Sequence, residues 1–397
     1  MQFRTDNPIQ FKDTNLFKPI QLGSIELKHR VVLAPLTRGR SDNYTPTAQM
    51  IEYYNQRSQK PGTLIITEGT FISPESGGIK VAPGIFTQEQ IEAWKPIHKK
   101  IHDNGSFSFQ QLWNLGWQSW PGVLANDGLK FVGASDDNYM DETSKQAALE
   151  VGNPIHGLTI PEIKEHVGNY VKAAENSLEA GADGVEIHSC NGYLLNQFLD
   201  TNSNKRTDEY GGSIENRSRF ILEIIDSVID AIGAFKIGVR FSPFGVYGNM
   251  NGDKNPMMIE LYSYIFDQLE KRAQDGKRIT YIHIVEPRVT SFVDDEGVNE
   301  SQGSNEFIYK FWKGLVIRAG NYALNPEIAL NDITNHPNTL LAYGRTFISN
   351  PDLPERLEKG LPLTKYNRET FYTPGEEGYI DYPRYSDMEQ HEKWCII

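Results

Sequence analysis

The chain has 397 residues, 39% of them hydrophobic, and a formal net charge of −13. This hydrophobic share is enough for a sizeable folded core, and the acidic balance excludes the basic face that a nucleic-acid partner requires. The two cysteines, Cys190 and Cys395, are too few for a disulfide framework or a four-thiolate metal site, and we predict no bound metal.

The N-terminal segment lacks the basic and then apolar stretch of a secretory signal. No apolar run approaches the length of a membrane span. Cys395 stands third from the C-terminus, whereas the prenylation pattern requires the fourth position. We therefore expect a cytoplasmic protein with no membrane partner.

Short β-rich runs alternate along the chain with longer stretches of helical period. Residues 18–27 predict a small hairpin around Gly23, which would cap the bottom of a barrel. The candidate inner strands that follow are Val31–Leu36, Thr63–Thr67, Phe107–Leu112, Gly184–Ile187, Lys236–Phe241, Ile279–Val285, Leu315–Ile317 and Leu340–Tyr343. The helical patterns between them are Thr47–Gln59, Thr87–Asp103, Ile160–Ala180, Ser213–Ile232, Met258–Asp275, Ser304–Lys313, Asn325–Asn335 and Asp352–Lys359.

Eight strands, each followed by a helix, favour an α/β fold of the (β/α)₈ TIM-barrel type, because parallel strands need crossover helices. The alternative is a doubly wound sheet, but the Gly-x-Gly-x-x-Gly turn typical of it is missing. The connection after the third strand, about 114–159, exceeds usual loop length, so we predict a lid over the barrel mouth that includes a small hairpin. Residues 286–302 predict a mobile flap. With no repeat and no linker, residues 1–397 are expected to form a single domain.

The segment after the fourth candidate strand concentrates polar groups. The strand residues Val185–Ile187 lead directly into His188, and Asn191 and Tyr193 follow in a turn marked by Gly192. An imidazole N–H, an amide NH₂ and a phenol O–H can all donate hydrogen bonds near neutral pH. Three such donors at one strand end suit an oxygen that becomes negative during a reaction. Taken alone, His188 could equally be a structural histidine.

A second group of residues follows strands seven and eight, where this fold commonly binds phosphate. Gly320-Asn321 and Gly344-Arg345 offer backbone N–H groups and a guanidinium, which together suit a phosphate dianion. Either glycine could instead simply end its strand. A phosphate site does not name a cofactor, since many sugar-phosphate enzymes share this corner.

The chain resembles the Old Yellow Enzyme family, most closely its yeast members, from about Asn15 to Tyr385. The resemblance rests on residues 188–199, His-Ser-Cys-Asn-Gly-Tyr-Leu-Leu-Asn-Gln-Phe-Leu, and on residues 206–217, Arg-Thr-Asp-Glu-Tyr-Gly-Gly-Ser-Ile-Glu-Asn-Arg. It implies a tightly bound, non-covalent FMN. By the family pattern, Arg240 and Gln111 would bind the pyrimidine end of the flavin, and Thr37 would hydrogen-bond the carbonyl beside its reactive nitrogen. The other residues implied as FMN-binding are Pro35, Leu36, Gly69, Gly320, Asn321, Gly344 and Arg345.

The resemblance also implies a reaction. His188 and Asn191 would hold the carbonyl oxygen of an α,β-unsaturated aldehyde or ketone, or a phenolic inhibitor, while Tyr193 protonates the α-carbon from the opposite face. The family pattern further suggests an aromatic substrate pocket, although each of these residues is equally compatible with an ordinary core position. They are Trp113, Tyr247, Phe292, Phe371 and Tyr372.

The expected activity is that of an ene-reductase with NADPH as hydride donor. Because the chain lacks a Gly-rich dinucleotide fold, the nicotinamide would share the substrate pocket in alternation. Alternatives are a flavin- or phenol-binding barrel with little turnover, an iron–sulfur relative, which the cysteine count disfavours, and a metal-free sugar-phosphate isomerase. The family suggests a homodimer. His283 and Glu286 lack a third ligand and are interpreted as structural, and Cys190 as a small buried hydrophobic residue.

Overall fold

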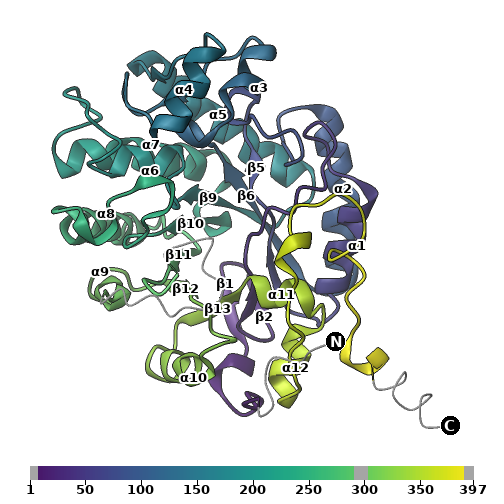
Figure 1. Ribbon diagram of the computed structural model, residues 1–397. Helices are drawn as coiled ribbons and strands as arrows, with labels where there is room; N and C mark the ends of the chain where they lie inside the picture. The colour runs from purple at the N-terminus through teal and green to yellow at the C-terminus, as the bar shows by residue number, and fades with distance from the viewer. Residues whose placement is uncertain (1–7, 290–302, 389–397) are drawn as a thin grey trace.

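The computed structural model describes residues 8–289 and 303–388. Eight parallel strands form a closed ring in which each strand pairs with its neighbour and β4 pairs with β6 to complete the circle (Figure 1). They are β3 (Val31–Leu33), β4 (Leu64–Ile66), β6 (Phe107–Trp113), β9 (Gly184–Ser189), β10 (Ile237–Phe241), β11 (Tyr281–Val285), β12 (Leu315–Ala319) and β13 (Thr339–Tyr343). The predicted (β/α)₈ barrel is therefore confirmed. A short strand, β5 (Thr70–Phe71), adds to β6.

Helices surround the ring, as Figure 1 shows. They are α1 (Ala48–Arg57), α2 (Gln88–Asp103), α5 (Ile160–Glu179), α7 (Ile214–Ile232), α8 (Met258–Gln274), α9 (Ile308–Phe311), α10 (Pro326–Asn335) and α12 (Leu353–Lys359). Thr159 begins α5 with a capping box, in which its hydroxyl accepts from the Glu162 N–H while the Glu162 carboxylate accepts from the Thr159 N–H. The helix predicted over 304–313 is shorter, because Trp312 already has extended backbone angles.

The hairpin predicted over 18–27 is formed by β1 (Ile20–Leu22) and β2 (Ile25–Leu27), which pair antiparallel. Leu22 and Leu27 are fully buried and belong to the same apolar cluster as Phe109 and other inward-facing barrel residues. The hairpin thus contributes side chains to the core inside the barrel.

Side chains along each barrel strand point alternately toward the surrounding helices and into the barrel interior. On β9, Val185 and Ile187 pack outward against the helices, so Glu186 and His188 face the barrel interior. The same alternation turns further polar side chains inward on the neighbouring strands. The buried polar set inside the barrel is Gln111, Glu186, His188, Arg240 and His283, from the adjacent strands β6, β9, β10 and β11. A cluster of this kind in a barrel core points to function, because buried polar groups are costly unless they are paired or bind a ligand.

The connection over 114–159 contains η3 (Gly116–Gln118), α3 (Pro121–Asn126), β7 (Val132–Gly133), α4 (Glu142–Glu150) and β8 (His156–Gly157). The expected small hairpin is wrong: β7 and β8 pair in parallel, because α4 lies between them as a crossover. The connection has a small core of its own that includes Trp117 and Phe131. Of the flap predicted over 286–302, residues 290–302 lie outside the described part of the chain. No helix among residues 8–289 and 303–388 is both long and apolar enough to cross a membrane.

Candidate active site

The strand that carries the predicted donors is longer than expected. β9 continues through His188 to Ser189, so His188 lies within the strand and not past its end. The reason is the neighbouring strand, whose ladder pairs Arg240 with His188 and Phe241 with Ser189. Because paired residues on parallel strands face the same side, His188 and Arg240 both face the barrel interior.

A tight turn follows β9. Asn191 and Gly192 both have positive φ, at 55° and 73°. The Asn191 N–H donates to Ser242 Oγ at 2.8 Å, and its carbonyl accepts from Gln118 Nε2 at 2.8 Å. A side chain at Gly192 would place its Cβ 2.5 Å from the Tyr247 carbonyl oxygen, so only glycine fits. The turn directs the chain into α6 (Leu194–Leu199), with Tyr193 as its N-cap residue.

His188 and Tyr193 meet at the end of this turn. Their ring centroids are 4.9 Å apart with the rings nearly perpendicular. Trp113, at the end of β6, contacts both: its ring lies 4.9 Å from that of Tyr193 and 6.1 Å from that of His188. The structure thus brings the predicted hydrogen-bond donor, the predicted proton donor and one predicted pocket aromatic together. Asn191 joins them through the turn, and its side chain is half-buried.

The environment sets the protonation states of these groups. Burial, reinforced by the positive charge of Arg240, holds the pKa of His188 well below its usual range, so the ring is neutral near pH 7 and carries one N–H. Burial and the nearby phenols Tyr247 and Tyr372 raise the pKa of Tyr193 well above that of a free tyrosine. The pair therefore offers a neutral hydrogen-bond donor and a protonated phenol.

Cys190 is fully buried between these groups, with Sγ 3.6 Å from His188 Nδ1. Burial raises the pKa of its thiol to about 12, so the sulfur is protonated and unreactive near neutral pH. It packs as a small apolar side chain.

Trp113 is held by its surroundings. Its ring stacks on Phe71 at 5.0 Å with an 11° angle between the planes. A Cβ at Gly69 would come within 2.6 Å of the Trp113 ring, so Gly69 is needed here to let the indole lie flat against the backbone. Ile79 and Tyr193 pack against the same apolar cluster.

The other predicted pocket aromatics are placed differently. Tyr247 packs against Tyr193 with the ring centroids 6.3 Å apart, and its phenol contributes to the raised pKa of Tyr193. Tyr372 is 53% exposed and lies close enough to affect the pKa of Tyr193. Phe371 is buried in a separate small cluster. Phe292 lies outside the described residues.

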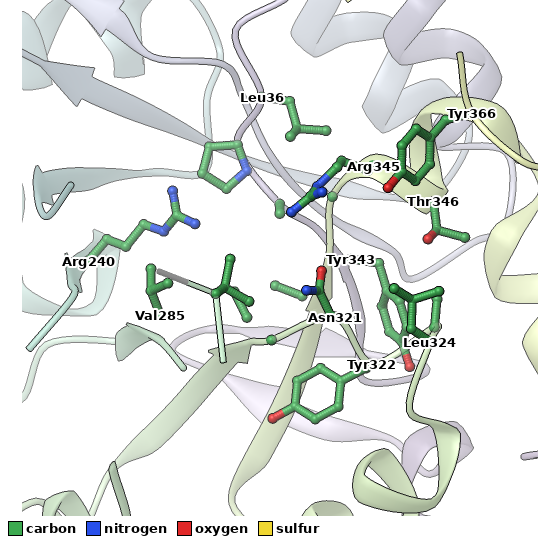
Figure 2. Close-up of a pocket in the computed structure, with 18 residues that line it drawn as sticks. Leu36, Arg240, Val285, Asn321, Tyr322, Leu324, Tyr343, Arg345, Thr346 and Tyr366 are labelled. Carbon is green, nitrogen blue, oxygen red and sulfur yellow. The ribbon is translucent and has the colours of Figure 1, made fainter. Parts of the chain in front are cut away.

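A cavity opens beside this group, with an empty volume of about 700 Å³ including its mouth (Figure 2). The predicted cofactor residues that line it are Pro35, Leu36, Arg240, Gly320, Asn321, Gly344 and Arg345. Figure 2 shows the guanidinium groups of Arg240 and Arg345 directed toward the same space, with Asn321 beside it. Asn321 also has a positive φ, 51°, which turns the chain sharply after β12. Thr37 is half-buried just beyond Leu36, while Gly69 and Gln111 are buried and lie outside this lining.

The lining fits a polar, anionic cofactor such as FMN. Among the described residues that line it, two carry a guanidinium group and none carries a carboxylate. Arg240 is only 9% exposed, yet among the described residues nothing accepts a hydrogen bond from its Nε. A buried guanidinium N–H without an acceptor is costly, which indicates that a polar ligand belongs there. The cavity is also lined by Tyr322, Val285 and Tyr366, which were not predicted from the sequence.

His283 and Glu286, both predicted to be structural, have different partners. His283 Nδ1 lies 2.9 Å from Glu186 Oε2 inside the barrel. Glu286 instead pairs with Arg318 outside it, at 2.6 Å. The period-2 alternation of β9, with Glu186 between two apolar residues, was the available signal for an inward carboxylate.

Comparison with known proteins places this geometry in a family. Residues 15–364 match the NADH:flavin oxidoreductase / NADH oxidase family. Enoate reductase 1 of Kluyveromyces lactis is 54% identical over 391 residues, 98% of each chain. A probable NADPH dehydrogenase of Candida albicans is 46% identical over 376 residues, 93% of this chain and 91% of the other. The crystal structure of Old Yellow Enzyme from Pichia sp. superposes with a TM-score of 0.89 at 43% identity, covering 94% of this chain and 95% of that one. The chain therefore belongs to the NADH:flavin oxidoreductase family, and within it to the Old Yellow Enzymes.

Proposed function

We propose that the chain is an FMN-dependent ene-reductase that uses NADPH to reduce the activated C=C bond of α,β-unsaturated aldehydes and ketones. The observation that carries the proposal is the contact between neutral His188 and protonated Tyr193, 4.9 Å between ring centroids, beside a cavity lined by Arg240 and Arg345. Relatives named enoate reductase and probable NADPH dehydrogenase support the substrate class and the hydride donor.

The cavity would hold FMN through distinct groups. Arg345 with the backbone of Gly320, Asn321 and Gly344 would bind the phosphate. Arg240 and Gln111 would bind the pyrimidine end, and the Arg240 charge favours the anionic form of the reduced ring. Pro35, Leu36, Thr37 and Gly69 would lie along the ring. When bound, FMN supplies the hydride equivalent that the substrate accepts at its β-carbon.

His188 and Asn191 would bind the substrate carbonyl oxygen. A neutral imidazole N–H and an amide N–H donate to this oxygen and stabilise the negative charge that develops on it. Because Arg240 and burial keep His188 neutral, the site polarises the carbonyl without placing a second full positive charge beside Arg240. Phenols would bind as inhibitors through the same two donors.

Tyr193 would supply the proton to the α-carbon. Its raised pKa keeps the phenol protonated throughout the neutral range, which a general acid requires. Trp113 packs edge-on against the Tyr193 ring and holds it in place, so Trp113 is expected to influence which substrate face is protonated.

The test is a spectroscopic cycle. The purified protein should be yellow, bleach on anaerobic addition of NADPH, and regain its colour on addition of 2-cyclohexenone. A para-substituted phenol should produce a long-wavelength charge-transfer band that weakens in the His188→Ala, Asn191→Ala double variant. A colourless protein would contradict the proposal, and bleaching without recovery would identify a flavin- or phenol-binding protein with little turnover. Assembly as a homodimer and a cytoplasmic location remain predictions.

A further inference from the structure

The barrel interior contains a buried carboxylate that the proposed reaction does not use. Glu186, on β9, is fully buried, and its two oxygens have different partners. Gln111 Nε2 donates to Glu186 Oε1 at 2.7 Å, and His283 Nδ1 lies 2.9 Å from Glu186 Oε2. Gln111 lies on β6, which neighbours β9, and His283 lies on β11, which β10 separates from β9. The three side chains form one hydrogen-bonded chain across the interior.

The polarity of this chain follows from chemistry. Burial alone would raise the pKa of Glu186, but His283, Arg240 and Gln111 lower it, so the group is a carboxylate that can only accept. Burial lowers the pKa of His283, so its ring is neutral and Nδ1 must carry the proton to donate. Gln111 must then turn its NH₂ toward Glu186, which fixes the side on which its carbonyl oxygen lies.

That orientation matters for a flavin. The pyrimidine ring of a flavin carries one N–H donor between two carbonyl acceptors. A side chain that binds this N–H must therefore present a hydrogen-bond acceptor to it. Gln111 could rotate by 180° if nothing held its amide, and it would then present NH₂ to this N–H. Glu186 removes that freedom, because a carboxylate tolerates only the NH₂ end.

The second consequence is electrostatic. Glu186 and Arg240 both face inward from neighbouring strands, and the charge of Arg240 lowers the pKa of Glu186. In a dry interior an anion near Arg240 cancels part of its field. Arg240 is the group proposed to favour the anionic reduced flavin, so Glu186 opposes that effect and makes the flavin harder to reduce.

We propose that Glu186, held by His283, is a positioning residue that orients the Gln111 amide toward the flavin. The charge of Glu186 also lowers the flavin reduction potential, because it offsets part of the Arg240 charge. Both roles rest on the proposed FMN site. Removing the charge of Glu186 should therefore raise the potential. Removing it should also weaken flavin binding through Gln111.

The experiment compares holoproteins. In Glu186→Gln, which keeps the side-chain shape, we expect the equilibrium between oxidised and reduced flavin to shift at least tenfold toward the reduced form. For a two-electron couple this corresponds to about 30 mV, measured against a reference dye. The matched control is Glu270→Gln, because Glu270 is another buried carboxylate, lies on α8 outside the barrel and pairs with Arg278. The control should leave the potential unchanged.

A second experiment tests whether Glu186 affects flavin binding through Gln111. Flavin dissociation constants of Glu186→Gln, Gln111→Leu and the double variant form a cycle, and the two losses should be clearly less than additive. If Glu186→Gln does not accumulate as folded protein, His283→Leu removes the donor that helps to lower the pKa of Glu186, so the buried carboxylate should take up a proton, lose its charge and again raise the potential. A native protein that binds no flavin would overturn the proposed function. A variant that binds flavin with an unchanged potential would overturn this inference alone.

Discussion

Replacing Tyr193 by phenylalanine separates the two half-reactions of the proposed cycle. The variant removes only the hydroxyl, so the ring can keep its edge-on contacts with His188 and Trp113, both at 4.9 Å. Losing the buried hydroxyl should cost about 1 kcal/mol of stability, too little to unfold the protein.

The loss of the proton donor should be much larger in rate. General acid catalysis contributes at least about 10²-fold, which is about 2.7 kcal/mol of transition-state stabilisation. We therefore expect reoxidation of the reduced flavin by 2-cyclohexenone to slow at least about 100-fold. Reduction of the flavin by NADPH needs no proton from Tyr193 and should change less than about threefold.

Stopped-flow absorbance of the flavin band measures each half-reaction separately. The matched control is Tyr170→Phe, because Tyr170 is a buried tyrosine on α5, away from the site, whose hydroxyl has no partner among the described residues. Both rates should be unchanged in the control. Equal slowing of both half-reactions in Tyr193→Phe would refute the proton-donor role.

Three further outcomes follow from the site and its surroundings. In a Cys395→Ala background, Cys190 should resist thiol reagents at pH 7, because burial raises the pKa of its thiol to about 12. Rapid labelling of the folded protein would contradict this protonated state. Cys190→Ala should leave enone turnover within about twofold. Burial raises the pKa of Glu68 from 4.5 to about 7, so its stabilising contribution is complete below about pH 4.5 and is lost as pH rises through 7. Unfolding by urea should therefore show a free energy about 2.5 kcal/mol lower at pH 8 than at pH 5, and Glu68→Gln should lack this part of the pH dependence. Gly192→Ala should lower the free energy of unfolding by at least about 1–2 kcal/mol and reduce enone turnover, because the new Cβ meets the Tyr247 carbonyl and the residue has a positive φ. A melting temperature equal to that of the native protein would contradict this expectation.

Several features followed from local sequence because their causes are local. The alternation of β-rich runs and helical periods predicted all eight barrel strands, since each inner strand must bury both faces and each helix must bury one. The spacing of His188, Asn191 and Tyr193 predicted one cluster, because six residues around a tight turn cannot separate far. Boundaries were less accurate: β9 extends to Ser189 because the ladder with β10 continues, and a ladder partner is not visible in the strand's own residues.

The amino-acid sequence alone thus determined the barrel class, the group of donors around the end of the fourth barrel strand, and the acidic, cysteine-poor character of the chain. Only the tertiary structure decided which buried groups face one another. In the folded protein Glu186 contacts Gln111 and His283 through hydrogen bonds, although these residues are 75 and 97 positions away in the chain. Glu286 instead forms an ion pair with Arg318. The tertiary structure also paired β7 and β8 in parallel and placed Phe371 in a separate cluster. The physical reason is that partner choice across a closed barrel depends on strand register and inward alternation, which link residues far apart in the chain.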